Sequence, residues 1–234
     1  LGQTVAAARG FSPATSRRRF RVGTGDALEQ ALVVEIFIAV AKLAPAVALD
    51  SVPCGPEEIP ELIVAGEIDI GLGVPVPHGD RVCHRVVARE PVLLAMRRDH
   101  PLARGPLTIE RWLAAEHLVV TGQTRGATIE DLALQKLGIE RRVARRCQTY
   151  QVAGQFIAQS NLVAVVPAYY AELFGQSGSL VTREFAIATP DLEVALYWAT
   201  TADGDPGGVW LRDLILEQIE RLNVRRARRA TKQH

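Results

Sequence analysis

The segment "FRVGTGDALEQAL" (residues 20–32) joins a short apolar run to a Gly-x-Gly turn and then to apolar positions at helical spacing. Two further strands are predicted at "VALDSV" (47–52) and at "IDIGLGV" (68–74), and the second is apolar and rich in β-branched residues. Between them lies "GPEEIPELIVAGE" (55–67), a loop followed by a helix that Gly66 ends. The order strand, helix, strand, helix, strand predicts a parallel sheet with helices on its faces.

The first helix is expected over residues 27–43, with Pro45 beyond its end. After residue 75 the alternation repeats, which predicts a second α/β unit. The expected elements there are an extended run at 83–98, helices at 108–116, 128–138, 151–160, 168–175 and 206–224, and strands at 117–122, 142–149, 162–167 and 193–200. Two such units predict two lobes, with a ligand cleft at the carboxyl ends of their parallel strands.

The composition is that of a folded chain with little net charge. Its 234 residues are 48% hydrophobic and carry a formal charge of +1 at pH 7, which argues against a surface devoted to nucleic acid. No apolar run reaches the ~18 to 20 residues that span a bilayer, and "LGQTVAAARG" (1–10) lacks the apolar core of a secretory signal. Cys54, Cys83 and Cys147 have no CxxC spacing, so we expect reduced thiols in a cytoplasmic protein.

The sequence lacks the motifs that mark common catalytic and cofactor sites. A dinucleotide fold needs a third glycine after Gly23 and Gly25, and this chain has Leu28 there. A GK[ST] phosphate loop, a GxSxG turn and an HExxH pair are all missing. The histidines are scattered, and we expect them in loops or at the surface (His78, His84, His100, His117 and His234). We therefore expect no cofactor, no metal and no catalysis, and we keep an enzyme on the same fold as an alternative.

The turn after the first strand is the best candidate for ligand recognition. Gly25 and Asp26 end a strand and begin a helix, where unpaired backbone N–H groups favour an anion or a carbonyl oxygen. Asp26 also admits a purely structural interpretation as an N-cap. Similar turns occur in "VTGQTRGAT" (120–128) and in "CQTYQVAG" (147–154), where Tyr150 offers an aromatic wall.

Charged residues flank the first and third strands. Three arginines (17–19) stand directly before the first strand. They either bind phosphate or form a solvated junction between a linker and the strand, and the second interpretation is favoured. Asp69, at the start of the third strand, is expected to be structural.

Four runs of the sequence carry a resemblance to a known family. They are "FSPATSRRRFRVGTGDALE" (11–29), "IPELIVAGEIDIGLG" (59–73), "HPLARGPLTIERWLAAEHLVV" (100–120) and "GQFIAQSNLVAVVP" (154–167). In this order and spacing, from about Phe11 to Leu222, they resemble the effector-binding part of a LysR-type transcriptional regulator. With "LYW" (196–198) and "DPGGVWLRDLI" (205–215), the opening run is most similar to the branch of nodulation-protein-D regulators and regulators of aromatic-compound degradation.

The resemblance implies an α/β fold of the type 2 periplasmic-binding-protein kind. Two Rossmann-like lobes would be joined by two crossover strands, near residues 89–90 and 191–194, with an inter-lobe cleft. The implied division is a linker-helix end (1–12) and linker within residues 1–19, regulatory lobe I at 20–89 plus 193–224, regulatory lobe II at 90–192, and a basic disordered tail at 225–234.

The resemblance also implies where an effector binds. The positions carried over are Thr24, Gly25, Asp26, Ala27, Gly55, Pro56, Thr121, Gln123, Thr124, Thr149, Tyr150 and Gln151. Many relatives have a serine where Gly25 stands, and its hydroxyl would bind an effector carboxylate; here only backbone amides are available. After "LYW" this chain has Ala199 and Thr200 where many relatives of the branch have histidine and proline.

The implied function is a regulatory domain that senses a small aromatic or carboxylate-bearing molecule. Family members pair through the first helix and a neighbouring strand, so we expect dimers, and tetramers of a longer protein. The excess apolar residues Val33, Phe37 and Val47 are the candidates for that interface. DNA would be contacted only through a helix-turn-helix preceding Leu1, and no membrane is expected. A solute-binding protein of a transporter, which shares the fold, stays open as an alternative.

Overall fold

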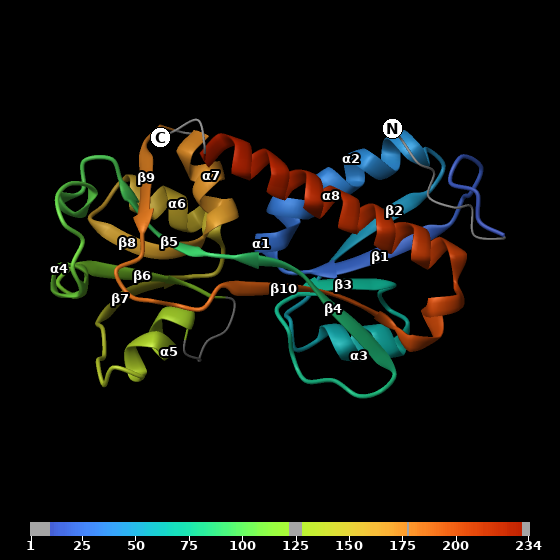
Figure 1. The fold of residues 1–234 in the computed structure, drawn as a ribbon, viewed down its shortest axis with the longest axis horizontal. Helices are drawn as coiled ribbons and strands as arrows, with labels where there is room; N and C mark the ends of the chain where they lie inside the picture. Colours follow the sequence, from blue (N-terminus) through green and yellow to red (C-terminus); the bar gives the residue numbers. More distant parts are fainter. Residues whose placement is uncertain (1–9, 122–127, 177, 231–234) are drawn as a thin grey trace. The chain divides into compact units, whose positions relative to one another are not determined.

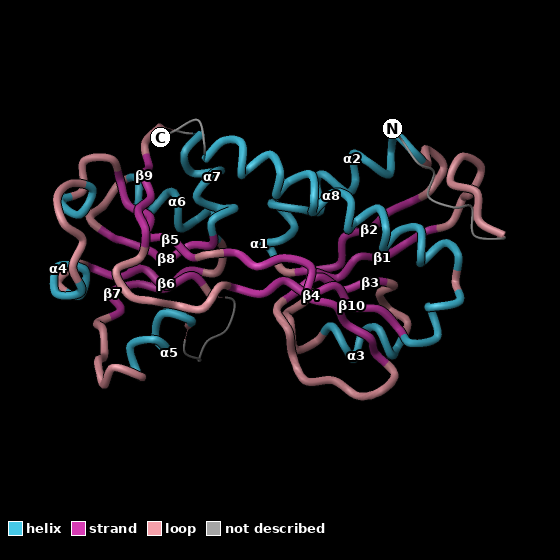
Figure 2. Tube along the Cα trace, viewed as in Figure 1, coloured by secondary structure: helices cyan, strands magenta, loops and turns pink. Residues whose placement is uncertain are grey.

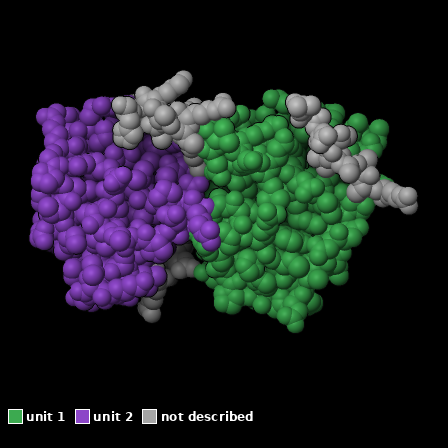
Figure 3. Space-filling view, viewed as in Figure 1, with its two compact units in different colours: residues 1–88, 193–234 green, residues 89–192 purple. Residues whose placement is uncertain are grey.

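The computed structural model describes residues 10–121, 128–176 and 178–230. The chain forms two compact units: residues 1–88 with 193–234 are unit 1, and residues 89–192 are unit 2 (Figure 3). The backbone passes between the units twice, after residue 88 and after residue 192. Every helix in the described ranges is too short or too polar to traverse a lipid bilayer.

Unit 1 contains five strands: β1 (Arg19–Thr24), β2 (Ala48–Pro53), β3 (Ile70–Gly73), β4 (Val82–Glu90) and β10 (Leu192–Ala199). They lie in the order β2-β1-β3-β10-β4 (Figure 1). β1 pairs in parallel with both β2 and β3, which confirms the predicted strand–helix–strand–helix–strand unit. β10 is antiparallel to β3, so the sheet is mixed rather than fully parallel.

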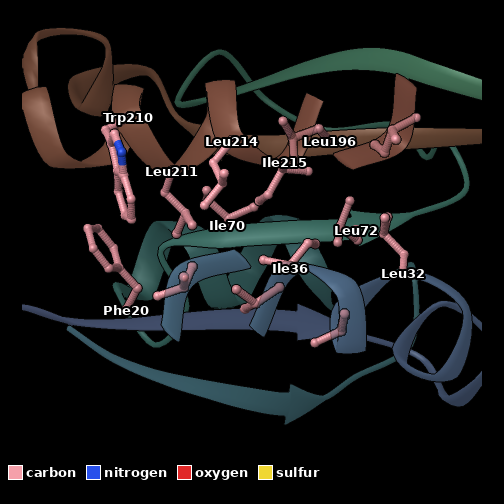
Figure 4. Packing of buried hydrophobic residues seen from close by; sticks show 14 of the residues in the cluster. Phe20, Leu32, Ile36, Ile70, Leu72, Leu196, Trp210, Leu211, Leu214 and Ile215 are labelled. Carbon is pink, nitrogen blue, oxygen red and sulfur yellow. The ribbon is translucent and has the colours of Figure 1, made fainter. Parts of the chain in front are cut away.

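Helices cover both faces of this sheet. They are α1 (Asp26–Leu28), a π-helical stretch (Glu29–Val33), α2 (Val34–Leu43), α3 (Ile59–Ala65), a 3₁₀ turn (Thr200–Gly204) and α8 (Pro206–Ala230). α2 and α8 pack against the face that carries Phe20, Ile70 and Leu72, and together they bury the main core of the unit (Figure 4). α3 packs Ile59 and Ile63 into a second core with Tyr197.

The glycines of "IGLG" in β3 allow α3 to lie directly on the sheet. Ile70 and Leu72 point into the core of α2 and α8, so the alternating positions Gly71 and Gly73 face α3. A Cβ atom at Gly71 would lie 2.3 Å from Cγ2 of Ile59, closer than carbon atoms pack. Close packing of helix on strand therefore requires glycine here.

Unit 2 repeats the design with its own five-stranded sheet (Figure 2). Its strands are β5 (Val92–Arg97), β6 (Glu116–Val120), β7 (Val143–Cys147), β8 (Leu162–Pro167) and β9 (Leu180–Glu184), in the order β7-β6-β8-β5-β9. Its helices are α4 (Ile109–Leu113), α5 (Ile129–Gln135), α6 (Tyr150–Ala158) and α7 (Ala168–Gln176), with a 3₁₀ turn at Pro101–Ala103. β6 is parallel to β7 and β8, and β5 is antiparallel to β8 and β9.

The structure differs from the expected elements in several places. The extended run at 83–98 is two strands, β4 and β5, which belong to different sheets and are separated at Pro91, a residue without an N–H to donate. β9 was not predicted from the sequence. The first helix begins at Asp26 rather than at residue 27, and it contains a π-helical stretch before α2.

Both ends of the chain also correct an expectation. The tail at 225–234 was expected to be disordered, but α8 continues through Ala230; residues 231–234 lie outside the described part. The run "RRARRA" has no glycine or proline, and arginine and alanine are strong helix formers, so the helix propagates. Of the expected linker-helix end at 1–12, the described residues 10–12 are not helical, and Gly10 has a φ of +112°.

The apolar surface of the first helix is not where the sequence placed it. Val33 is 2% exposed, and Phe37 and Val47 pack against the core. Val34, Ile38 and Leu43 are exposed instead, by 52%, 46% and 53%. Leu32, Ile36 and Val40 of the expected stripe are buried, and the buried face extends to include Val33, with Phe37 packed against it.

Candidate functional site

In unit 1, the candidate residues after β1 form the start of a helix that has no side-chain cap. Thr24 ends β1 and is buried, and its hydroxyl donates a hydrogen bond to the carbonyl oxygen of Leu72 (3.1 Å). Gly25 is the N-cap residue, with φ −84° and ψ 161°, and therefore offers no hydroxyl or carboxylate to the first backbone N–H groups. Ala27, half-buried in the first turn, adds no polar group. The first backbone N–H groups of α1 therefore receive no hydrogen-bond acceptor from a capping side chain.

Asp26 is the first helical residue, which rules out its interpretation as the N-cap. Its Oδ1 accepts a hydrogen bond from Nε2 of Gln30 (2.8 Å). Its Oδ2 is buried and has no hydrogen-bond partner among the described residues. A buried carboxylate oxygen without a partner can accept a hydrogen bond from a donor group of a ligand.

The loop after β2 lies beside the loop after β1. The amide of Cys54 donates a hydrogen bond to the carbonyl oxygen of Thr24 (3.1 Å), and a Cβ atom at Gly25 would lie 3.8 Å from the carbonyl oxygen of Cys54. The next residue, Gly55, donates its amide to Oε2 of Glu58 (2.6 Å), and Pro56 follows it. The candidates of unit 1 therefore gather at the carboxyl ends of two adjacent parallel strands, as the sequence predicted for a ligand site.

Cys54 is a thiol in this neighbourhood, and its environment keeps it protonated. Burial, and secondarily the charge of Glu58, raises the pKa of the Cys54 thiol to about 11. A thiol rather than a thiolate is present at neutral pH, so it is a poor nucleophile. Cys54, Cys83 and Cys147 are all free, as expected.

In unit 2, the candidates gather at the corresponding ends of β6 and β7. The amide of Thr121 donates to the carbonyl oxygen of Cys147 (2.9 Å), which joins the ends of the two strands. Thr149 is the N-cap of α6, and its hydroxyl accepts from the amide of Val152 (3.3 Å). The ring of Tyr150 lies 4.5 Å from that of Tyr170, at a tilt of 32°. Gln151 is exposed, and Gln123 and Thr124 lie outside the described residues.

A buried charged cluster in unit 2 escaped the sequence analysis. The Arg141 side chain is 1% exposed and pairs with Glu130 Oε1 (2.8 Å) and Asp131 Oδ1 (2.7 Å). Burial by itself would raise the pKa of Asp131, but hydrogen bonds from Arg141 and Thr128 hold it below its ordinary value. Glu130 and Asp131 lie in the first turn of α5, where carboxylates look like ordinary helix-surface charges. Arg141 lies in a loop ten residues after Asp131 and eleven after Glu130, so no local spacing could reveal the pairing.

Two histidines expected in loops or at the surface are core residues. His117 is fully buried and meets the Trp112 ring edge-on at 4.5 Å. Burial, assisted by the charge of Arg141, lowers the pKa of His117 to about 4. His100 is also buried, and it accepts the amide of Leu102 at Nδ1 (3.0 Å). Both are neutral structural residues at pH 7.

Arg18, Arg19 and Asp69 make contacts within unit 1. Arg18 pairs with Asp205 (2.6 Å) and stacks over the ring of Phe20 at 4.4 Å. Arg19 pairs with Asp50 (2.7 Å). Asp69 accepts the backbone amide of Arg21 (2.8 Å), which ties the start of β3 to β1.

Two α/β units of this topology, connected by two chain crossings, define the type 2 periplasmic-binding-protein class of fold. A family model described as the LysR substrate binding domain matches residues 13–220. The chain therefore belongs to the LysR family, and it is the regulatory, effector-binding domain of that family rather than an enzyme.

Curated relatives and a solved structure agree with this assignment. The chain is 26% identical over 207 residues to the HTH-type transcriptional activator NagR of a Ralstonia species, covering 88% of this chain and 69% of that protein. It is 26% identical over 209 residues to nodulation protein D 2 of Rhizobium tropici, covering 89% of this chain and 66% of that protein. The regulatory domain of MexT, a transcriptional activator in Pseudomonas aeruginosa, matches with a TM-score of 0.80 at 25% identity, over 88% of this chain and all of that one. The predicted family and branch are confirmed.

Proposed function

We propose that the chain senses a small aromatic molecule with the loops Thr24–Ala27, Gly55–Pro56, Thr121–Thr124 and Thr149–Gln151. The observation that carries this proposal is the position of these loops: in each unit the described candidates stand at the carboxyl ends of adjacent parallel strands. That edge is where open α/β folds bind their ligands. In this proposal both loop sets contribute to effector binding, in a cytoplasmic protein.

The unpaired oxygen of Asp26 favours an effector that carries a hydrogen-bond donor. Its Oδ2 has no partner in the described chain, and Gly25 supplies no hydroxyl as many relatives would. An effector carboxylate close to Asp26 would meet a like charge, whereas a phenolic hydroxyl or an amine would donate to the waiting oxygen. Tyr150 would supply a flat wall for an aromatic ring. We therefore favour an aromatic effector with a hydrogen-bond donor over a plain carboxylate.

The signal would leave the domain as a shift between two arrangements. An effector moves such an equilibrium only if it binds one arrangement of the lobes, or of paired copies, more tightly than the other. DNA would be contacted by a segment outside this chain, and the effector would act on it through the geometry of a dimer or tetramer.

We propose that two copies pair through the exposed apolar side of α2 and the neighbouring edge strand β2. Val34 and Ile38 on α2 lie one helical turn apart and are exposed, and β2 is an edge strand of the sheet of unit 1. An exposed apolar stripe beside an open strand edge suits self-association. Light scattering across protein concentrations should show dimers, and Ile38→Glu should give monomers; a monomer at all concentrations would contradict this part of the proposal.

A ligand screen tests the effector proposal. Thermal unfolding of the chain should shift upward with concentrations of phenolic or amino-substituted aromatic compounds, because a ligand of the native state stabilises it by mass action. Plain aliphatic carboxylates should give a smaller shift. A flat response across a broad panel of both classes would contradict the sensing function.

Variants of the candidate loops test the residues separately from the function. Asp26→Ala and Tyr150→Ala should each weaken the selected ligand at least 10-fold while leaving the unliganded melting temperature within a few degrees. Asp50→Ala is the matched control, since this carboxylate of β2 pairs with the exposed Arg19 of β1. If the control and the two variants bind the ligand equally well, the assignment of the binding loops is wrong, although the sensing function is still supported by the ligand binding itself.

A further inference from the structure

His78 and His84 form a side-chain pair in unit 1 that the sensing function does not use. His78 lies in the loop before β4 and is half-buried, and His84 lies in β4 and is exposed. Nε2 of His78 is 2.6 Å from Nδ1 of His84, and the ring centroids are 4.8 Å apart at an interplanar angle of 82°. The six-residue separation matches no metal-binding spacing, so the sequence alone does not predict that the two histidines pair.

The hydrogen bonds of His78 fix which of its nitrogens carries the proton. Nδ1 of His78 lies 3.1 Å from the carbonyl oxygen of Gly79. A carbonyl oxygen only accepts, so Nδ1 carries the hydrogen and neutral His78 presents the lone pair of Nε2 to His84. Orientation by a backbone carbonyl is also the usual outer-shell support of a metal-ligating histidine.

Tyr197 of β10 holds both histidines in place. The Tyr197 hydroxyl donates to the carbonyl oxygen of Val74 (2.9 Å) and accepts from the amide of Val76 (2.8 Å), which anchors the segment leading to His78. The His84 ring stacks on the Tyr197 ring, with centroids 5.5 Å apart and planes at 27°. Tyr197 is fully buried, so the pair rests on a rigid support.

We propose that His78 and His84 form an open bis-imidazole site for a divalent transition-metal cation, with Cu²⁺ and Ni²⁺ preferred to Zn²⁺. The metal would replace the hydrogen that the two rings share. Neutral His84 would move its proton from Nδ1 to Nε2, so both rings stay neutral and each gives one lone pair to the cation.

The distance between the nitrogens favours one coordination geometry. With metal–nitrogen bonds of about 2.0–2.1 Å, two ligands at a right angle have nitrogens about 2.9 Å apart, and two at the tetrahedral angle about 3.4 Å apart. The present separation is 2.6 Å, so right-angle coordination needs the smaller opening. Tetragonal and octahedral geometries belong to Cu²⁺ and Ni²⁺, and the tetrahedral one to Zn²⁺; Cu²⁺ is also the tightest binder of its row.

The site would be incomplete and therefore modest in affinity. In the described part of the chain, no group of three or more His, Cys, Asp or Glu side chains is arranged to hold a metal ion. Two imidazoles would leave the other coordination positions to water. Protons would compete with the metal for the same lone pairs, so occupancy should fall in acid.

Calorimetric titration of the chain, free of any affinity tag, with Ni²⁺ at pH 7.5 tests the proposal. Ni²⁺ suits this purpose because the thiols of Cys83 and Cys147 would reduce Cu²⁺. We expect one Ni²⁺ per chain with a Kd in the micromolar range, weakened at least 10-fold by His78→Ala and by His84→Ala. His234→Ala is the matched control and should leave the Kd unchanged.

Two further results decide the proposal. In the Cys83→Ser/Cys147→Ser chain, bound Cu²⁺ should give an electron paramagnetic resonance spectrum with coupling to two imidazole nitrogens, lost in His84→Ala. Zn²⁺ should bind more weakly than Ni²⁺. Unchanged Ni²⁺ binding in both histidine variants, or no binding by the parent chain, would overturn the site, and tighter Zn²⁺ binding would overturn the metal preference.

Discussion

Unit 1 and unit 2 share one strand order: three parallel strands, then an antiparallel strand that follows a chain crossing, then an edge strand. They differ in how the helix begins that follows the middle one of the three parallel strands, β1 in unit 1 and β6 in unit 2. In unit 2, Thr128 and Asp131 form a reciprocal capping box at the start of α5, and Arg141 braces both. In unit 1, the corresponding start has Gly25 as N-cap and no capping side chain. The same topology thus contains two different helix N-termini. That of α5 is capped by side chains of the protein, and that of α1 has no capping side chain.

We expect the capped N-terminus of α5 to contribute to stability and the uncapped N-terminus of α1 to contribute to binding. At the start of α5, Thr128 and Asp131 already satisfy each other's backbone amides, so a ligand gains little by binding there and mutations should cost stability. Where the start is bare and an adjacent carboxylate oxygen has no partner, mutations should cost little stability and change binding.

The largest effect is expected from Arg141→Leu. It leaves Glu130, which is 5% exposed, without its cation, and breaking a buried pair from one side costs about 3–5 kcal/mol. Hydrogen exchange followed peptide by peptide should show unit 2 opening much more readily and unit 1 little changed. Arg19→Leu removes an exposed pair and should cost under about 1 kcal/mol. Equal costs for the two variants would mean that the cluster does not brace α5.

His117 should make the stability of unit 2 depend on pH. The folded pKa of His117 is about 4, below the ordinary value near 6.5, so the unfolded chain binds more protons in that interval. Stability from neutral His117 is therefore complete above about pH 6.5 and is lost as the pH falls through 4, by about 3 kcal/mol in all. His117→Phe should reduce this slope in unit 2 peptides. Burial also lowers the pKa of His100, so a smaller slope should remain.

The smallest effect compares the two helix starts directly. Thr128→Ala removes an N-cap hydroxyl that accepts the amide of Asp131, and should destabilise unit 2 by about 1 kcal/mol. Gly25→Ser exchanges two acceptable N-cap residues and should change unit 1 by only a few tenths of a kcal/mol. Chemical denaturation monitored by hydrogen exchange checks both. A large stabilisation by Gly25→Ser would indicate that α1 lacks a cap for stability rather than for binding.

Much of the fold could be predicted from the sequence because strong local signals mark its elements. The apolar run "LVAVVP" became β8, fully buried, and Gly66 ends α3 with a left-handed φ of +70°. Thr108 and Thr149 cap α4 and α6. Each of these features depends on neighbours within a few residues, so periodicity and capping rules reach them.

The remaining features depend on distant contacts. β9 has only a short mixed run, "LVTRE", and is a strand because β5 offers it an edge. The pairing of Arg141 with Glu130, and of His78 with His84, follows from loops that bring separate elements together. The candidate loops were located by family resemblance, and their chemistry became specific only when the structure showed the unsatisfied oxygen of Asp26.

Backbone amide chemical shifts, recorded while the best ligand of the screen is titrated, test the central claim most directly. The amides at the bare start in unit 1, residues 24–28, and those of residues 54–56 and 149–151 should move in a saturable way with one dissociation constant. The amides of residues 128–131, at the capped start of α5, should stay in place. Saturable shifts at 128–131 with none at 24–28 would contradict the claim that the bare helix start is the one that binds the effector.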